Sequence, residues 1–328
     1  MEDKEMRVVV TGAGGFIGSH LSRYLKNRGY WVRAVDVKWE NYISEYADQY
    51  VTADLRKAQS CLRVVKGMDR VYNLAANMGG IGYITTVKAE VMRDNVLINV
   101  NMLEAARINK TDRYFFSSSA CVYPTYKQES SEVMPLKEDD AYPAEPDNEY
   151  GWEKLFTERL CMDYAEDFGL EVRIARFHNI YGPEGTYRGG REKAPAALCR
   201  KVAEASNPGK ITIWGDGKQT RSFCYIDDCI RGIEALMESD YAKPVNIGSD
   251  RLVTIDELAD MIIKISGKEI TKEYDPSRPQ GVRGRNADLS LASKVIGWKP
   301  IVPLEEGLER TYRWIEKKVL EDRQRENT

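Results

Sequence analysis

A glycine-rich turn near the start of the chain constrains the fold most strongly. The stretch VVVTGAGGFIGSH places Gly12, Gly15 and Gly18 between an apolar run and an amphipathic segment. Glycines in this position permit a tight turn and let the backbone approach a pyrophosphate, which rests on the amino end of the following helix. A glycine triplet alone is weak evidence because glycines also form ordinary turns. The apolar run before it and the helical pattern after it predict a dinucleotide-binding βα unit.

The same alternation continues along the first half of the chain. The apolar runs WVRAVDVK, DRVYNLAA, RYFFSSS and EVRIARFHNIYG alternate with helical stretches such as SHLSRYLKNRG. This rhythm predicts an α/β fold with a Rossmann-type, doubly wound parallel sheet. After about residue 180 the pattern changes to a smaller α+β region, in which Thr254 and Glu257 form a capping-box pattern before a helix.

An acidic residue at the end of the second apolar run indicates which dinucleotide binds. Asp36 follows Gly18 in the position where a carboxylate accepts hydrogen bonds from the adenosine ribose and repels a 2′-phosphate. NAD is therefore favoured over NADP, although Lys38 nearby leaves the second reading open. The alternative for Asp36 is an ordinary surface acid in a turn.

Composition excludes several other classes of function. The 328 residues carry a net charge of −3, which does not suit a nucleic-acid partner. Six cysteines without C-x-x-C pairs and two scattered histidines give no metal-site spacing, so we expect reduced thiols and no metal. The acidic start and the lack of an apolar run of about 20 residues predict a cytoplasmic protein without a membrane partner.

Three residues have the chemistry of a proton-transfer group beside the dinucleotide. Tyr150 and Lys154 are four residues apart, so they share one face of a helix. Tyrosine, with a pKa of about 10, is a poor base at neutral pH, but nearby positive charge favours its phenolate. Ser119, at the end of the RYFFSSS run, is placed to hold the same substrate hydroxyl. On its own, Y-x-x-x-K usually marks a helix surface.

A cysteine and a lysine form a second candidate pair. Cys121 follows the RYFFSSS run, at the carboxyl end of a strand, where open α/β sheets bind their ligands. It is either a small core residue or an acid/base group, because positive neighbours activate a thiol. Lys193 begins a predicted helix near Arg188 and Arg191, and like charges with partial burial would lower its pKa. An anion-binding loop explains these basic residues equally well.

Longer motifs resemble known families. The spacing T-G-x-x-G-x-x-G, with NLAANMGG and YGWEK, resembles the extended short-chain dehydrogenase/reductase superfamily. Within it, SSSACVYP, RFHNIYGPEGTYRGGREKAPAA, WGDGKQTRSF and GVRGRN are similar to the GDP-mannose 3,5-epimerase family. This resemblance implies epimerisation of GDP-D-mannose to GDP-L-galactose, with GDP-L-gulose from 5-epimerisation, through a 4-keto sugar and bound NAD. It implies that Cys121 and Lys193 are the acid/base pair, and that Tyr150 and Lys154 serve the redox steps.

The resemblance also implies contacts with both ligands and a division into domains. Residues 1–180 are expected to form the NAD-binding domain, to which the chain returns at about 222–250, and residues 181–328 the nucleotide-sugar-binding domain. NAD contacts are expected at Gly12, Gly15, Phe16, Ile17, Gly18, Asp36, Asp54, Leu55, Ala75, Tyr150 and Lys154. GDP-sugar contacts are expected at Gly79, Ser119, Ala120, Cys121, Asn179, Glu192, Lys193, Ala194, Lys201, Gln219, Thr220, Arg221 and Arg283.

Other functions stay open at this point. The main alternative is an NAD-dependent nucleotide-sugar 4-epimerase or a related enzyme, which needs no second acid/base pair. A catalytically silent NAD-binding protein on the same fold is the other. The resemblance further implies a homodimer, formed by the helix that contains NVNMLEAARI and the helix that carries Tyr150.

Overall fold

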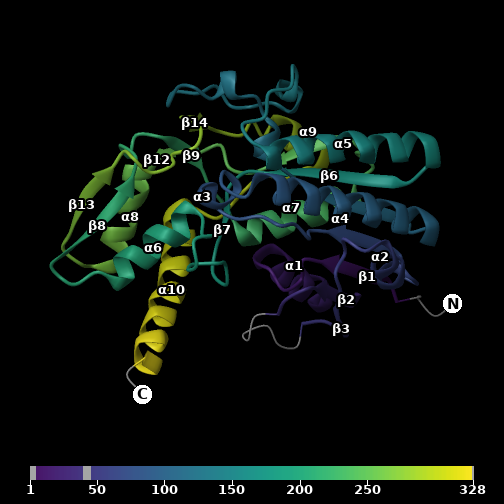
Figure 1. Cartoon of the computed structure of the whole chain (residues 1–328), viewed down its shortest axis with the longest axis horizontal. Helices are drawn as coiled ribbons and strands as arrows, with labels where there is room; N and C mark the ends of the chain where they lie inside the picture. Colours follow the sequence, from purple (N-terminus) through teal and green to yellow (C-terminus); the bar gives the residue numbers. More distant parts are fainter. Residues whose placement is uncertain (1–4, 40–45, 327–328) are drawn as a thin grey trace.

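The computed structural model describes residues 5–39 and 46–326. The first four residues of the acidic start and the last two residues of the chain lie outside the described residues. A seven-stranded parallel sheet in the order β11-β6-β5-β4-β1-β2-β3 forms the centre of the molecule (Figure 1). Its strands are β1 (Arg7–Thr11), β2 (Trp31–Asp36), β3 (Gln49–Thr52), β4 (Arg70–Asn73), β5 (Arg113–Ser119), β6 (Glu171–Phe177) and β11 (Pro244–Ile247). The predicted Rossmann-type fold class is confirmed.

Burial on both faces explains why the strands are continuous apolar runs. Val8 and Val10 of β1 pack into one core cluster, with Leu21 and Leu25 of the following helix, whereas Val9 packs into the cluster on the opposite face. Parallel sheets with two covered faces select such runs. The helices on the first face are α1 (Phe16–Asn27) and α7 (Ile226–Glu238), and those on the second are α2 (Ala58–Val65), α4 (Lys88–Asn109) and α5 (Glu149–Phe168).

The order of the strands in the sheet determines where a ligand site can lie. Because β1 and β4 are neighbours while their connections run to opposite sides, their carboxyl ends form a crevice of the kind that binds ligands. The segment after β5 begins with the short helix η1 (Ala120–Val122), and the loop after β4 contains α3 (Ile81–Ile84). Both segments therefore lie at the carboxyl edge of the sheet.

A second, smaller group of elements lies at one end of the molecule (Figure 1). Helices α6 (Ala194–Glu204), α8 (Ile255–Ser266) and α10 (Leu304–Glu326) pack together beside the parallel pair β8 (Gly209–Trp214) and β13 (Ile270–Asp275). The capping box of α8 is confirmed, since the Glu257 N–H donates to Thr254 Oγ1 at 3.0 Å. Helix α10 buries Ile315 and Val319 in this group.

Short strands connect the two groups. Strand β9 (Thr220–Ser222) pairs with β12 (Leu252–Thr254) and β14 (Gly284–Arg285), and β7 (Ile180–Tyr181) pairs with β10 (Cys224–Tyr225). Between these pieces the chain re-enters the main sheet as β11, against which α9 (Ser290–Ile296) packs. The two regions are therefore interleaved along the sequence.

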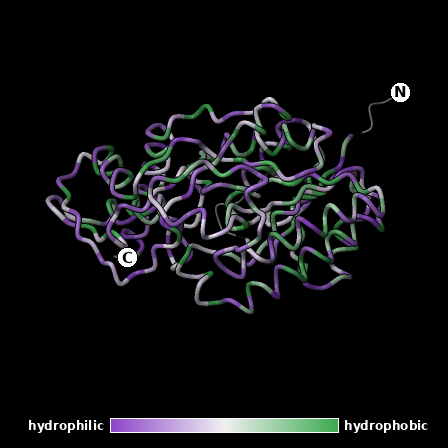
Figure 2. The backbone as a smooth tube through the Cα atoms, turned by 90° about the horizontal axis from the view of Figure 1, so that it is seen from above, coloured by the Kyte–Doolittle hydropathy of each residue, from purple (hydrophilic) through white to green (hydrophobic). Residues whose placement is uncertain are grey.

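Hydrophobic and hydrophilic stretches alternate along the chain (Figure 2). Within the described ranges, every helix is too short or too polar to cross a membrane. Five cysteines, Cys61, Cys161, Cys199, Cys224 and Cys229, are buried, whereas Cys121 is partly exposed.

Candidate active site

The glycine turn forms a cradle with the shape that a dinucleotide needs. Gly12 has φ +67°, and a Cβ at Gly18 would lie 2.1 Å from the Gly12 carbonyl oxygen. Helix α1 begins after Gly15 with no side-chain cap and no acidic residue in its first turn. Its first amides are thus available to an anion, which the helix dipole favours. This arrangement fits the diphosphate of NAD, with Phe16 and Ile17 in that first turn.

Asp36 lies beside this turn at the end of β2. Its carboxylate accepts hydrogen bonds from the Gly14 N–H at 2.9 Å and from the Val37 N–H at 2.7 Å. Burial raises the pKa of Asp36, and the backbone donors oppose that shift. The carboxylate is therefore held in place at the edge of the cradle, where a ribose would bind.

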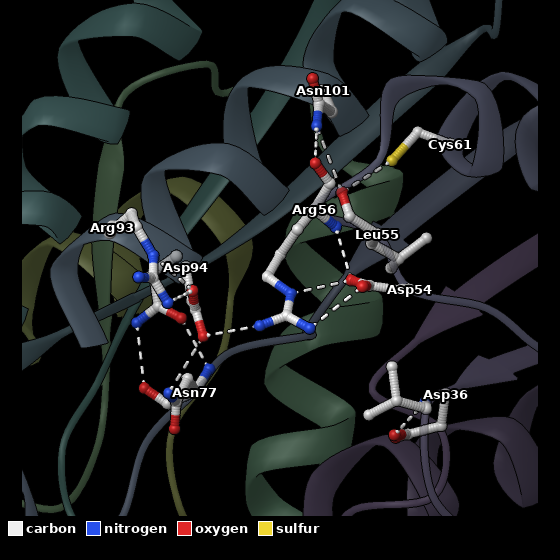
Figure 3. Close-up of polar contacts among 11 residues, drawn as sticks. Asp36, Asp54, Leu55, Arg56, Cys61, Asn77, Arg93, Asp94 and Asn101 are labelled. Carbon is white, nitrogen blue, oxygen red and sulfur yellow. Dashed lines mark hydrogen bonds and ion pairs between the residues drawn. The ribbon is translucent and has the colours of Figure 1, made fainter. Parts of the chain in front are cut away.

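Asp54 occupies the next loop and is restrained by an arginine. Arg56 donates to Asp54 at 2.9 Å and to Asp94 of α4 at 3.1 Å, so it bridges the two carboxylates (Figure 3). The side-chain hydrogen bond from Arg56 lowers the pKa of Asp54. Leu55 beside it is buried, and Ala75 donates its N–H to the Thr11 hydroxyl at 3.1 Å. The NAD contacts expected at Asp54, Leu55 and Ala75 thus follow β3 and β4, at the carboxyl edge of the sheet.

Ser119, Tyr150 and Lys154 lie close to one another. Ser119 ends β5, and its hydroxyl forms a side-chain hydrogen bond with Tyr150. Lys154 is buried, with Nζ 5.4 Å from the centre of the Tyr150 ring and 4.8 Å from that of Phe116. Burial raises the pKa of Tyr150 well above its usual value, whereas the Ser119 hydrogen bond lowers it. Burial lowers the pKa of Lys154.

Cys121 sits in η1, directly against the helix that carries Tyr150. A Cβ at Gly151 would lie 2.1 Å from the Cys121 carbonyl oxygen, so only glycine allows this approach. The Cys121 N–H donates to Ser119 Oγ at 3.2 Å. Arg285 Nη1 lies 3.5 Å from the Cys121 sulfur, within hydrogen-bonding distance. The thiol therefore faces the site, next to a cation.

Lys193 approaches from the loop before α6 and interacts electrostatically with Cys121. Loss of solvent lowers its pKa, as expected, but the neighbouring arginines are not the cause. Arg191 lies over the Tyr83 ring at 3.9 Å, and Arg188 pairs with Asp322 at 2.8 Å. The predicted contribution of these like charges is wrong, because both guanidinium groups are engaged elsewhere.

The expected sugar-nucleotide residues come from several elements of the structure. Gly80 donates its N–H to the Arg191 carbonyl at 3.0 Å, which docks the loop that carries Glu192 and Lys193 on the segment after Gly79. Ala194 begins α6, and Lys201 donates to the Thr212 carbonyl at 2.6 Å. Asn179 has φ +42° and donates to the Ser222 carbonyl at 2.9 Å. Ala120 is buried in η1.

The remaining expected contacts lie on and around β9. Gln219 and Thr220 are buried, and burial lowers the pKa of Arg221 to about 9. Arg283 is partly exposed and forms a two-point ion pair with Asp216 at 2.8 and 2.9 Å. It is thus turned toward Asp216, whereas Arg285, two residues on, is the arginine at Cys121.

Two residues of the site were not among the contacts expected from the sequence. Arg285 lies at Cys121 and also contacts Asp147 at 3.4 Å and Gln128. Glu153 is buried beside Lys154, although its neighbours in the sequence suggest an ordinary helix surface. The GVRGRN motif and the acidic residue inside YGWEK are the signals that could have found them. His178 is also buried, and its Nε2 lies 2.8 Å from Asn246 Oδ1.

This fold and its glycine turn define a dinucleotide-binding α/β protein of the Rossmann type. The chain belongs to the NAD dependent epimerase/dehydratase family, whose model matches residues 8–248. NAD is accordingly its cofactor.

Named relatives are similar to this chain over most of its length. It is 48% identical to GDP-mannose 3,5-epimerase of Arabidopsis thaliana over 318 residues, which are 96% of this chain and 84% of the relative. Among solved structures, UDP-glucose 4-epimerase of Thermotoga maritima with UDP-glucose has a TM-score of 0.88 at 27% identity, covering 96% of this chain and all of the other. UDP-glucuronic acid 4-epimerase of Bacillus cereus, in complex with UDP-glucuronic acid and NAD, has a TM-score of 0.82 at 31% identity, covering 95% and 100%.

Proposed function

We propose that the chain is an isomerase that epimerises GDP-D-mannose at the 3- and 5-positions to GDP-L-galactose, with GDP-L-gulose formed by 5-epimerisation alone. The observation that carries this proposal is the position of Cys121, which contacts Arg285 and lies against the Tyr150 helix, together with Lys193 on the loop before α6. The identity with named GDP-mannose 3,5-epimerases supports it.

The cradle after β1 would hold the cofactor. Gly12, Gly15 and Gly18 leave room for the diphosphate, and Asp36 would accept hydrogen bonds from the adenosine ribose. Asp54, Leu55 and Ala75 would border the adenine end. The chemistry that bound NAD supplies is reversible oxidation at the 4-position of the sugar, with no net redox change over a full cycle.

Tyr150 moves the proton of the 4-hydroxyl group. Its oxygen is hydrogen-bonded to Ser119, which would hold the same substrate hydroxyl. Burial raises the pKa of Tyr150, so Tyr150 requires positive charge beside its ring in order to act as a base. Lys154 provides an ammonium on the same helix face.

Cys121 and Lys193 exchange protons on the neighbouring carbons. A 4-ketone acidifies the hydrogens at the 3- and 5-positions, and inversion requires removal of a proton on one face and delivery on the other. The guanidinium of Arg285 lies 3.5 Å from the Cys121 sulfur, and on this geometry we assign removal of the proton to Cys121. Lys193 is suited to deliver one. A ring flip after the first inversion brings the 3-position to the same pair.

The sugar nucleotide would lie across the second group of elements. Arg221 and Arg283 present guanidinium groups, whose planar donors suit a diphosphate. Gly79, Asn179, Glu192, Ala194, Lys201, Gln219 and Thr220 would complete the contacts, with Ala120 beside Cys121. Residues 1–180 with the 222–250 segment would bind NAD, and residues 181–328 the GDP-sugar.

The protein is further proposed to act as a cytoplasmic homodimer. Helices α4 and α5 lie side by side (Figure 1) and expose apolar side chains, including Met92, Leu97, Trp152 and Phe156. An apolar face of this kind fits a second copy of the same chain.

Product analysis tests the activity and the main alternative together. The purified protein is incubated with GDP-mannose and, separately, with UDP-glucose, and the released sugars are identified after acid hydrolysis. We expect galactose and gulose from GDP-mannose and no change in UDP-glucose. Conversion of UDP-glucose to UDP-galactose without reaction of GDP-mannose would instead indicate a nucleotide-sugar 4-epimerase.

A further inference from the structure

Glu153 is a fully buried acid next to the redox lysine. Its side chain lies on α5 with no exposure to solvent. Asn95 Nδ2 donates to one carboxylate oxygen at 2.9 Å, and Asn99 Nδ2 donates to the other at 3.1 Å. The first of these oxygens lies 3.8 Å from Lys154 Nζ. A buried carboxylate with two neutral donors needs a nearby cation, and Lys154 is placed to be that cation.

The two asparagines connect this carboxylate to the cofactor cradle. Asn95 accepts from the Asn77 N–H at 2.6 Å and donates to the Asn77 carbonyl at 3.1 Å. Asn77 belongs to the loop after β4, at the edge shown in Figure 3. Asn99 accepts from Asn73 at 3.0 Å, and Asn73 in turn accepts from Thr11 at 2.8 Å, one residue before Gly12.

We propose that Glu153 is a positioning residue for the redox half of the reaction: it is the buried counter-ion of Lys154 and ties α5 to the loop after β4 through Asn95 and Asn99. The proposal rests on the role proposed above for Tyr150 and Lys154. Glu153 itself does not reach the substrate. Glu153 determines the position of the Lys154 ammonium. It also determines the pH range in which Lys154 is an ammonium and Tyr150 is a phenolate.

The charges around Lys154 and Tyr150 give the direction of the effect. Burial lowers the pKa of Lys154 and Glu153 raises it, with smaller contributions from Cys161, Glu158 and Cys121. Burial raises the pKa of Tyr150, and Glu153 raises it further, as does Cys121. Removing the Glu153 charge therefore lowers both pKa values. Both limbs of the pH profile of turnover should move to lower pH together.

The first test is the pH profile of kcat for GDP-mannose turnover by the NAD-loaded enzyme. Glu153→Gln should move both limbs down by about one pH unit, a size typical of one close charge, with KM little changed. Glu166→Gln removes an exposed acid from the same helix and should leave the profile in place. Glu153→Asp keeps the charge and should keep the wild-type limbs even if kcat falls. A Gln variant whose limbs superimpose on those of the wild type would overturn the proposal.

A second readout does not depend on turnover. The urea midpoint of unfolding is measured for Glu153→Gln, Lys154→Met and the double variant without substrate. If the two charges are counter-ions, the loss caused by Glu153→Gln should shrink by at least half in the Lys154→Met background. If Glu153→Gln is unfolded while the double variant is folded, the two charges are also shown to be counter-ions. Equal losses in both backgrounds contradict the proposal.

The two proposals can fail separately. A wild-type enzyme that does not turn over GDP-mannose contradicts the proposed function, while the urea midpoints still decide whether Glu153 and Lys154 are paired. Turnover by the wild type with an unshifted Glu153→Gln profile contradicts only the role of Glu153.

Discussion

The guanidinium of Arg285 lies 3.5 Å from the sulfur of Cys121, although 164 positions separate the two residues in the sequence. Burial would lower the pKa of Arg285, but Cys121 and Asp147 outweigh burial, so the pKa is raised. The same contact places a cation beside the Cys121 sulfur. This geometry supports the acid/base role that we propose for Cys121.

Removing this cation should slow the reactions of the thiol. We expect Arg285→Gln to reduce the rate of Cys121 alkylation by iodoacetamide at pH 7 by about tenfold, because one close charge is worth roughly 1.4 kcal/mol in such a buried setting. Mass spectrometry of the alkylated peptide gives the rate. Arg313→Gln, an exposed arginine on α10, serves as the control. An unchanged rate in Arg285→Gln would show that Arg285 does not activate Cys121.

The glycine cradle should not tolerate a single added methyl group. A Cβ at Gly18 meets the Gly12 carbonyl oxygen at 2.1 Å, so Gly18→Ala must displace the turn. We expect the variant to lose bound NAD, measured as nucleotide released per chain on denaturation. Gly82→Ala is the matched control, because its Cβ would meet Trp214 at an ordinary 3.7 Å. Full NAD content in Gly18→Ala would contradict the placement of the diphosphate.

The Tyr150 hydroxyl should be essential for turnover but not for folding. Tyr150→Phe keeps the ring and removes the group that is hydrogen-bonded to Ser119. We expect kcat to fall by about 10²- to 10⁴-fold, the usual worth of a general acid/base. Tyr274→Phe, a partly exposed residue of β13, should turn over like the wild type. A Tyr150→Phe enzyme of near wild-type kcat would exclude Tyr150 as the proton carrier.

His178 should make folding stability depend on pH. Burial lowers its pKa from 6.5 to about 3. The unfolded chain therefore takes up a proton first, so the free energy of unfolding falls as pH drops from about 6.5 toward 3, by at most about 1.4 kcal/mol per pH unit from this group. His178→Gln should show a shallower fall between pH 6 and 4 in urea unfolding. Parallel curves for the two proteins would mean that His178 does not titrate on unfolding.

Local patterns in the sequence predict the fold, the glycine turn and the helix cap. The apolar strand runs, the glycine turn and the Thr254–Glu257 capping box each depend on residues that are close together in the sequence, so their structures follow from adjacent chemistry. The contact between Arg285 and Cys121 depends on the pairing of β14 with β9, and no local pattern in the sequence specifies that pairing. In the sequence Glu153 resembles an ordinary acid on a helix surface, and only the packing of α4 against α5 shows that it is buried. Arg191 is two residues from Lys193 in the sequence, but its guanidinium lies over the Tyr83 ring.

Proton exchange with solvent tests the central claim most directly. GDP-mannose is incubated with the enzyme in deuterated water and followed by NMR, for the wild type, Cys121→Ala and Lys193→Met. We predict that the wild type introduces deuterium at both the 3- and 5-positions, with new galacto- and gulo-configured products, and that Cys121→Ala introduces none while it retains NAD. Inversion at the 4-position without deuterium at either carbon, or undiminished exchange in Cys121→Ala, would contradict the account.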